Sequence, residues 1–237
     1  MLIQAHQPCD RCHSSDALAI YTDATKCFSC GWRTKVSNHS LFAIAERTKL
    51  GIQISDNLPI DALAYLLKYR IFQSDIISSG IKYDNVSNRI LFPMTADGSY
   101  QGRSLDKDKI KYMTYGDKDY KRFGDGDTVV LCEDWLSSYR VAQQPGISSV
   151  CLFGTSCTSS SLLRLVNSNC TVVVWLDGDK PGQDAAKKLI KSLALYYRSL
   201  YNVSTSHDPK TYSDDDIRGA LYERISNHAG CTKERKL

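Results

Sequence analysis

The sequence lacks any long apolar run. Stretches such as Val172 to Leu176 fall far short of the ~18 residues that a membrane-spanning helix needs. The segment Met1 to Gln7 has neither the basic start nor the apolar block of a secretory signal. From these absences we expect a cytoplasmic protein that makes no contact with a membrane.

A strong excess of one charge is also lacking. The chain of 237 residues has 30 Lys and Arg against 26 Asp and Glu, a net charge of +4, and its 24% of charged residues is ordinary. This balance allows an anionic partner without requiring one. With 42% hydrophobic residues the chain is neither disordered nor fibrous, and its length predicts one or two compact domains.

The cysteine count, nine, is odd, which excludes a complete set of internal disulfides. Two Cys-x-x-Cys pairs lie near the N-terminus with 14 residues between them. Each pair can direct two thiolates at one ion, and segments 17–21 and 26–28 can pair as a short hairpin. We therefore predict a zinc ribbon with one structural Zn²⁺, a redox dithiol being the alternative. Its ligands are Cys9, Cys12, Cys27 and Cys30.

Changes in composition along the first half of the chain predict where its parts begin and end. After a ribbon at 1–36, scattered Ser, Asn and Asp predict a linker at 37–58. A small basic α+β subdomain follows at 59–127, and Pro93 predicts that one of its strands lies at a sheet edge. The elements we expect there are helices at 61–69 and 75–79 and a hairpin of strands at 89–94 and 100–105.

Basic and aromatic residues alternate from Arg103 to Arg122. Seven basic side chains against four acidic ones give this segment a net charge of +3, and three tyrosines lie among them. Such a composition suits a surface that follows phosphates and stacks bases, although a solvated loop has the same appearance. The basic residues are Arg103, Lys107, Lys109, Lys111, Lys118, Lys121 and Arg122.

From residue 128 the pattern becomes α/β. Apolar strands at 129–132, 149–153 and 171–176 alternate with helices at 136–143 and 183–197, which predicts a parallel sheet. Functional side chains of such sheets lie just beyond the carboxyl ends of the strands. In this chain those positions hold Glu133, Asp177 and Asp179.

Three carboxylates at one sheet edge repel one another unless a divalent cation joins them. Mg²⁺, or Mn²⁺ in its place, keeps coordination positions open for phosphate oxygens, and this arrangement suits nucleotidyl transfer. The alternative is that the Asp177-Gly178-Asp179 segment only turns the chain and caps the following helix.

These motifs resemble the TOPRIM domain of bacterial-type DNA primases, most specifically in Asp177 to Ala186. Gly102-Arg103 and Lys111-Tyr112 resemble the basic subdomain that precedes TOPRIM in primases. The four-cysteine segment is similar to the module in the primase half of podophage primase-helicases, which suggests a phage protein acting in the host cytoplasm. The resemblance covers most of residues 8–210, and it implies a TOPRIM subdomain at 128–206 followed by a C-terminal helix and tail at 207–237.

The resemblance implies a role for each matching residue. Glu133, Asp177, Asp179 and Asp208 are the expected catalytic acids. The first three are expected to hold Mg²⁺, with a second ion near Asp179 and Asp208. Nucleotide and template phosphates would meet Arg103, Lys109, Lys111 and Lys180, and the ribbon would recognise a template trinucleotide.

The function implied is synthesis of short RNA primers on single-stranded DNA from ribonucleoside triphosphates, beside a separate replicative helicase and a DNA polymerase. One departure is Ser137, which stands where primases carry a further acid, so that Asp134 is expected to replace that acid or the position is empty. The alternatives are a TOPRIM nuclease and a catalytically silent DNA-binding or helicase-loading adaptor. We also expect Ile217, Leu221 and Ile225 to cover the sheet.

Overall fold

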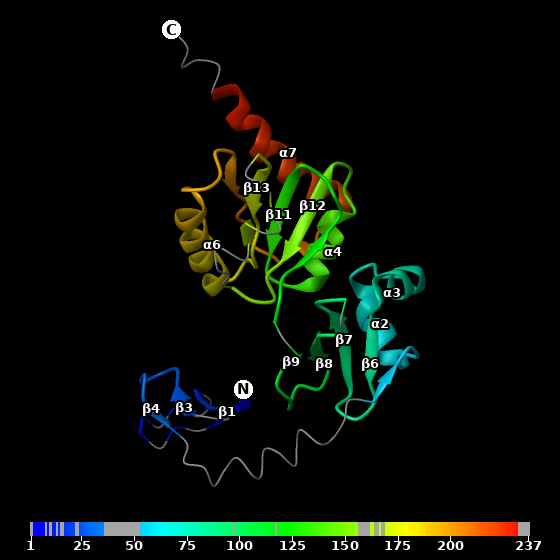
Figure 1. Ribbon diagram of the computed structural model, residues 1–237, viewed down its shortest axis with the longest axis vertical. Helices are drawn as coiled ribbons and strands as arrows, with labels where there is room; N and C mark the ends of the chain where they lie inside the picture. The colour runs from blue at the N-terminus through cyan, green and yellow to red at the C-terminus, as the bar shows by residue number, and fades with distance from the viewer. Residues whose placement is uncertain are drawn as a thin grey trace. The chain divides into compact units, whose positions relative to one another are not determined.

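The computed structural model describes most of the chain (Figure 1). Most of the predicted linker, together with Cys157 and the last six residues, lies outside the described residues. The chain divides into two compact units: the first is Met1–Ala62, Ile81–Leu91 and Gly102–Met113, and the second is Leu63–Gly80, Phe92–Gln101 and Thr114–Leu237. The described residues are 2–7, 9, 11, 12, 14, 17–21, 24–35, 53–96, 98–116, 118–155, 162, 163, 166 and 169–231.

The N-terminal segment folds as a small antiparallel sheet in the order β1-β2-β3-β4. The predicted hairpin is confirmed, with Leu18 paired to Cys27. Gly31, at φ +74°, takes the left-handed conformation in the turn after the second cysteine pair. The strands are β1 (Leu2–Gln7), β2 (Leu18–Tyr21), β3 (Ala24–Cys27) and β4 (Arg33–Lys35).

A second sheet has the order β5-β6-β7-β8-β9. The edge position predicted from Pro93 is wrong, because β7 lies between β6 and β8. Pro93 is the last residue of β7, so its missing N–H falls at the end of the strand. The strands are β5 (Ile54–Ser55), β6 (Lys82–Asp84), β7 (Arg89–Pro93), β8 (Tyr100–Ser104) and β9 (Tyr112–Tyr115).

Two short helices accompany this part of the chain, α2 (Ile60–Lys68) and α3 (Gln73–Ser79). Both match the predicted helices within two residues at either end. Gly80 ends α3 in the left-handed conformation, and its N–H bonds to carbonyl groups of the last helical turn.

The third sheet, in the second unit, has the order β10-β12-β11-β13-β14. Its last four strands in that order run parallel, which confirms the prediction, and β10 pairs antiparallel at one edge. Strand β10 was not predicted, and its first two residues belong to the basic segment. The strands are β10 (Lys121–Phe123), β11 (Thr128–Cys132), β12 (Ile147–Cys151), β13 (Thr171–Val174) and β14 (Leu200–Asn202).

Helices cover both faces of this sheet. Figure 1 shows α6 (Lys180–Leu193) on one side, and α4 (Trp135–Ala142) and α7 (Asp214–Cys231) on the other. Alternate residues of each strand face the two layers, so Val129 packs towards α6 while Val130 packs towards α7. Ile217 and Leu221 of α7 are fully buried against the sheet, as predicted. The α/β fold class with its N-terminal β-module is confirmed.

Burial of this kind stabilises the second unit by roughly 1.5–3 kcal/mol for each large aliphatic side chain removed from water. The short 3-10 helix η2 (Pro209–Thr211) leads into α7. No helix in the described part of the chain combines the length and the apolar character needed to cross a membrane.

Candidate functional site

Three carboxylates meet at the carboxyl ends of β11 and β13. The side chains of Asp134, Asp177 and Asp208 place oxygens within 4.8 Å of one another. The third member comes from a distant segment, which Gly178 allows to approach: a Cβ at this position would lie 2.5 Å from the carbonyl carbon of Ser206. Glycine is therefore required where the loop before η2 crosses the end of β13.

Asp134 of this cluster and Asp179, which is not one of the three, also cap helices. Asp134 caps α4, accepting hydrogen bonds from the backbone N–H and the hydroxyl of Ser137, each at 3.0 Å. Asp179 caps α6, accepting a hydrogen bond from the N–H of Gly182 at 2.8 Å. The capping role considered for the Asp177-Gly178-Asp179 segment is thus real for its second acid. Ser137 occupies the position where primases carry a further acid, and its two hydrogen bonds hold Asp134 in place.

Lys210 lies inside this group of acids, and sequence reasoning missed it. Its ammonium nitrogen is 2.6 Å from Oδ2 of Asp134 and 2.7 Å from Oδ2 of Asp208, and its side chain is only 8% exposed. Burial opposes the charged form, but the carboxylates of Asp134 and Asp177 outweigh it and raise the pKa of Lys210 well above its usual range. Lys210 therefore stays protonated at every physiological pH.

Glu133 and Asp177 lie in surroundings that disfavour the charged form of a carboxyl group. Burial, followed by the charges of Asp134 and Asp179, raises the pKa of Glu133 to about 7. Burial, with Asp134 as the next cause, raises the pKa of Asp177 to about 7 as well. Oδ1 of Asp177 is also buried without a hydrogen-bond partner. A buried, unpaired carboxylate oxygen next to further carboxylates suits a hard divalent cation, so the acids present fit Mg²⁺.

The four predicted zinc ligands come together in the first unit. Their sulfur atoms all lie within 4.8 Å of one another, and those of Cys12 and Cys27 are 3.6 Å apart. A hydrogen bond involving the backbone of Ser14 lowers the pKa of Cys12 to about 6, and so favours the thiolate that binds metal. Four sulfur ligands and two tight turns fit a closed, structural Zn²⁺ site.

Basic side chains lie over aromatic rings on this module. The guanidinium carbon of Arg11 is 5.2 Å from the ring centre of Trp32, and the ammonium of Lys26 is 4.7 Å from that of Phe28. Phe28 is 62% exposed. An exposed ring beside a cation is suited to stack on a nucleic-acid base while the cation meets phosphate.

The predicted phosphate-binding residues fall into two places. In the first unit, Arg103 donates a hydrogen bond to the hydroxyl of Tyr112 at 2.6 Å, and the ammonium of Lys111 lies 5.3 Å from the centre of the same ring. These three residues join β8 to β9 and form what we call the Arg103 cluster. In the second unit, Lys180 is exposed at the start of α6, directly after Asp179.

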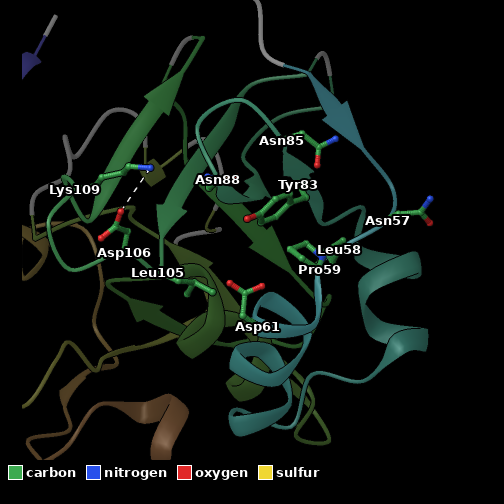
Figure 2. Close-up of a pocket in the computed structure, with 10 residues that line it drawn as sticks. All are labelled: Asn57, Leu58, Pro59, Asp61, Tyr83, Asn85, Asn88, Leu105, Asp106 and Lys109. Atoms are coloured by element: carbon green, nitrogen blue, oxygen red, sulfur yellow. Dashed lines mark ion pairs between the residues drawn. The ribbon is translucent and has the colours of Figure 1, made fainter.

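Lys109 lies apart from the Arg103 cluster. Its ammonium is 3.6 Å from a carboxylate oxygen of Asp106, and both residues line a pocket of about 740 Å³ in the first unit. Figure 2 shows this ion pair and the polar side chains around the pocket, among them Tyr83 and Asp61. Because its charge is already paired, Lys109 is a weaker candidate for phosphate binding than Arg103 or Lys111.

Residues 131–213 match the family model described as Toprim-like. The chain is 26% identical over 175 residues to the DNA primase of Pseudomonas putida, a match covering 64% of this chain and 26% of that protein. It is 25% identical over 172 residues to the DNA primase of Buchnera aphidicola, covering 63% of this chain and 30% of that protein. The chain thus spans less than a third of the length of these relatives.

Among solved structures, the E. coli primase catalytic core shares the fold, with a TM-score of 0.54 and 17% sequence identity over 70% of this chain and 74% of that one. The Toprim-like match contains all the acids gathered at the ends of β11 and β13. Residues 131–213 are thus similar to Toprim-like domains, and the chain is similar in sequence to bacterial DNA primases.

Proposed function

We propose that this protein synthesises short RNA primers on single-stranded DNA from ribonucleoside triphosphates, for use in DNA replication. The observation that carries the proposal is the cluster of acids at the carboxyl ends of β11 and β13, one buried and two half-buried, inside the Toprim-like match of a chain similar to DNA primases. The four-thiolate module supports it, because it is suited to hold a template strand.

In this proposal Glu133, Asp177 and Asp179 hold Mg²⁺, or Mn²⁺ in its place. When bound, the ion supplies Lewis-acid chemistry, lowering the pKa of a ribonucleotide 3′-hydroxyl and neutralising the triphosphate. The acids fix the position at which O3′ attacks the α-phosphorus. The new O3′–P bond forms as the bond to pyrophosphate breaks, and the hydroxyl proton passes to water.

The basic residues handle the substrates. Arg103, Lys111 and Lys109 contact phosphates of the template and the nucleotide, and Lys180 contacts the triphosphate beside Asp179. Cys9, Cys12, Cys27 and Cys30 hold a structural Zn²⁺, and the ribbon recognises the template through its basic and aromatic side chains. The proposed divisions are ribbon 1–36, linker 37–58, basic subdomain 59–127, TOPRIM 128–206 and C-terminal helix 207–237.

A replicative helicase and a DNA polymerase are the proposed partners, in the cytoplasm where primers are used. The nuclease and adaptor hypotheses receive no support from the relatives, which are named as primases. Both hypotheses still predict distinct products, so one experiment separates them from primer synthesis.

The test incubates zinc-loaded protein with Mg²⁺, labelled ribonucleotides and single-stranded templates that contain every trinucleotide. We expect short template-dependent RNA products, and a loss of about a hundredfold or more in Asp179→Asn. Asparagine keeps the cap of α6, so this variant removes the charge while preserving the helix. Asp184→Asn, an exposed change on the same helix, is the matched control.

Zinc content and DNA affinity should be unchanged in Asp179→Asn. Full activity of that variant would refute the proposed site. Cleaved templates would establish the nuclease instead, and normal DNA binding with no incorporation under any metal would establish the adaptor.

A further inference from the structure

The position of Lys210 limits where a metal ion can bind. Its nitrogen lies between the carboxylates of Asp134 and Asp208, at hydrogen-bond distance from both. Mg²⁺ binds carboxylate oxygens at about 2.0–2.1 Å, so an ion shared by these two acids would have to occupy the space that the ammonium fills. The two cations exclude each other from this half of the cluster.

Lys210 is fixed in this position. It is almost fully buried, and its ammonium also lies 6.0 Å from the ring centre of Tyr69. Asp134, its closest partner, is held in turn by two hydrogen bonds from Ser137, which is completely buried. With the bond from Lys210, the carboxylate of Asp134 accepts three of the roughly four hydrogen bonds that its lone pairs allow. It has little capacity left for a metal.

The other half of the cluster is different. Oδ1 of Asp177 is buried without a hydrogen-bond partner. Glu133 directly follows β11, and Asp179, the N-cap of α6, comes two residues after Asp177. None of the ion pairs found among the described residues joins Lys210 to Glu133, Asp177 or Asp179.

We infer that Lys210 is a built-in cation that takes the place of a second metal ion, so that the acidic site holds one divalent ion, at Glu133, Asp177 and Asp179. This inference rests on the proposed function, and it replaces the second ion that the sequence led us to expect near Asp179 and Asp208. Lys210 acts as a positioning residue: its charge holds Asp134 and Asp208 and keeps that half of the site closed to metal.

The test counts bound Mn²⁺ by electron paramagnetic resonance on the zinc-loaded full chain, without nucleotide or DNA. The double variant Asp177→Asn with Asp208→Asn supplies the background from ions bound elsewhere. Above that background we expect one ion in the wild type and a second one in Lys210→Met, which keeps the length of the side chain but removes its charge. Lys210→Arg, which restores the charge, should return the count to one.

Lys187→Met is the matched control, since it removes a charge from an exposed lysine of α6. Zinc content and a melting curve identify a variant that has failed to fold, in which case Lys210→Gln replaces Lys210→Met. Two ions in the wild type would overturn the inference whether or not any variant folds. A count of one in folded Lys210→Met would overturn it too.

This count is independent of primer synthesis. A wild type that binds one ion but makes no primers would refute the proposed function and leave the role of Lys210 standing. A wild type that binds two ions and makes primers would support the proposed function and refute the role of Lys210.

Discussion

The two candidate metal sites of this protein differ in the size of the hydrophobic core beside them. The thiolate site lies in a small sheet whose described buried apolar residues are few and small: Cys9, Ala19, Ala24 and Cys27. The acidic site lies at the edge of a sheet with large buried side chains on both faces, including Leu131, Trp175 and Leu189. We therefore expect the first to need a metal ion to fold and the second to fold without one.

Their electrostatics can also be compared. In the thiolate site, the backbone at Ser14 lowers the pKa of Cys12 to about 6, while desolvation and the other three thiols outweigh a hydrogen bond at Trp32 and raise the pKa of Cys30 to about 11. In the acidic site, burial and neighbouring acids disfavour the charged forms of Glu133 and Asp177, and Lys210 compensates only part of the negative charge. The acidic site thus retains a surplus of negative charge, which suits a divalent cation.

The largest expected effect comes from removing zinc. Cys9→Ser should unfold residues 2–35, because zinc binding contributes roughly 10–16 kcal/mol in modules of this size. The second unit should stay folded, since its core contains no part of the ribbon. Zinc analysis and amide hydrogen exchange check this.

Cys170→Ser is the control, because this buried thiol lies in the core of the second unit and is not one of the four predicted zinc ligands. Protected amides in the ribbon of zinc-free Cys9→Ser would show that the module does not depend on its metal, and the contrast between the two sites would then disappear.

A smaller effect should appear in the pH dependence of the second unit. The folded-state pKa values of Glu133 and Asp177 are about 7, above their usual values of 4.5 and 3.8, so the folded state binds these protons more tightly than the unfolded state. Their contribution to the unfolding free energy therefore falls as the pH rises from about 4 to 7, on the order of a few kcal/mol in total.

The measurement is thermal unfolding from pH 5 to 8 in zinc-replete buffer without Mg²⁺. Asp177→Asn should flatten the decline relative to wild type, and added Mg²⁺ should stabilise the wild type most at the upper end. Asp184→Asn, at an exposed position, should follow the wild-type curve. If Asp177→Asn and wild type decline in parallel, the acids are not strained as the structure indicates.

Much of this could be predicted from local sequence. The spacing of Cys9, Cys12, Cys27 and Cys30 located the thiolate cluster, and the apolar run before Asp177 located β13 and the acids at its end. In both cases the relevant residues are close in sequence, or their position follows from the regular geometry of a parallel sheet.

What the sequence did not show depends on long-range contacts. Lys210 pairs with Asp134, 76 residues away, and no spacing rule links a lysine after a proline to a helix cap near the middle of the chain. Ser137 was interpreted only as a missing acid because its donation to Asp134 needs the start of α4 to be known. The edge position predicted from Pro93 was wrong because a proline excludes only a strand interior from the middle of a sheet, and Pro93 is the last residue of β7.

The smallest expected effect concerns the first unit's basic side chains, and it tests whether the two units divide binding from catalysis. Arg103→Ala and Lys111→Ala should each weaken binding of single-stranded DNA and lower the slope of log K against log salt by about 0.7, the value for one lost phosphate contact. Lys109→Ala should change the slope less, because Asp106 already pairs with that ammonium. Fluorescence anisotropy across a salt series measures all three, with Lys187→Ala as the control on α6.

An equal change in Lys109→Ala and Arg103→Ala would mean that the ion pair between Lys109 and Asp106 opens on binding. An unchanged slope in Arg103→Ala would show that the Arg103 cluster does not contact the template. Asp179→Asn should leave the slope at its wild-type value, since it removes a negative charge that contacts no template phosphate in the proposed site.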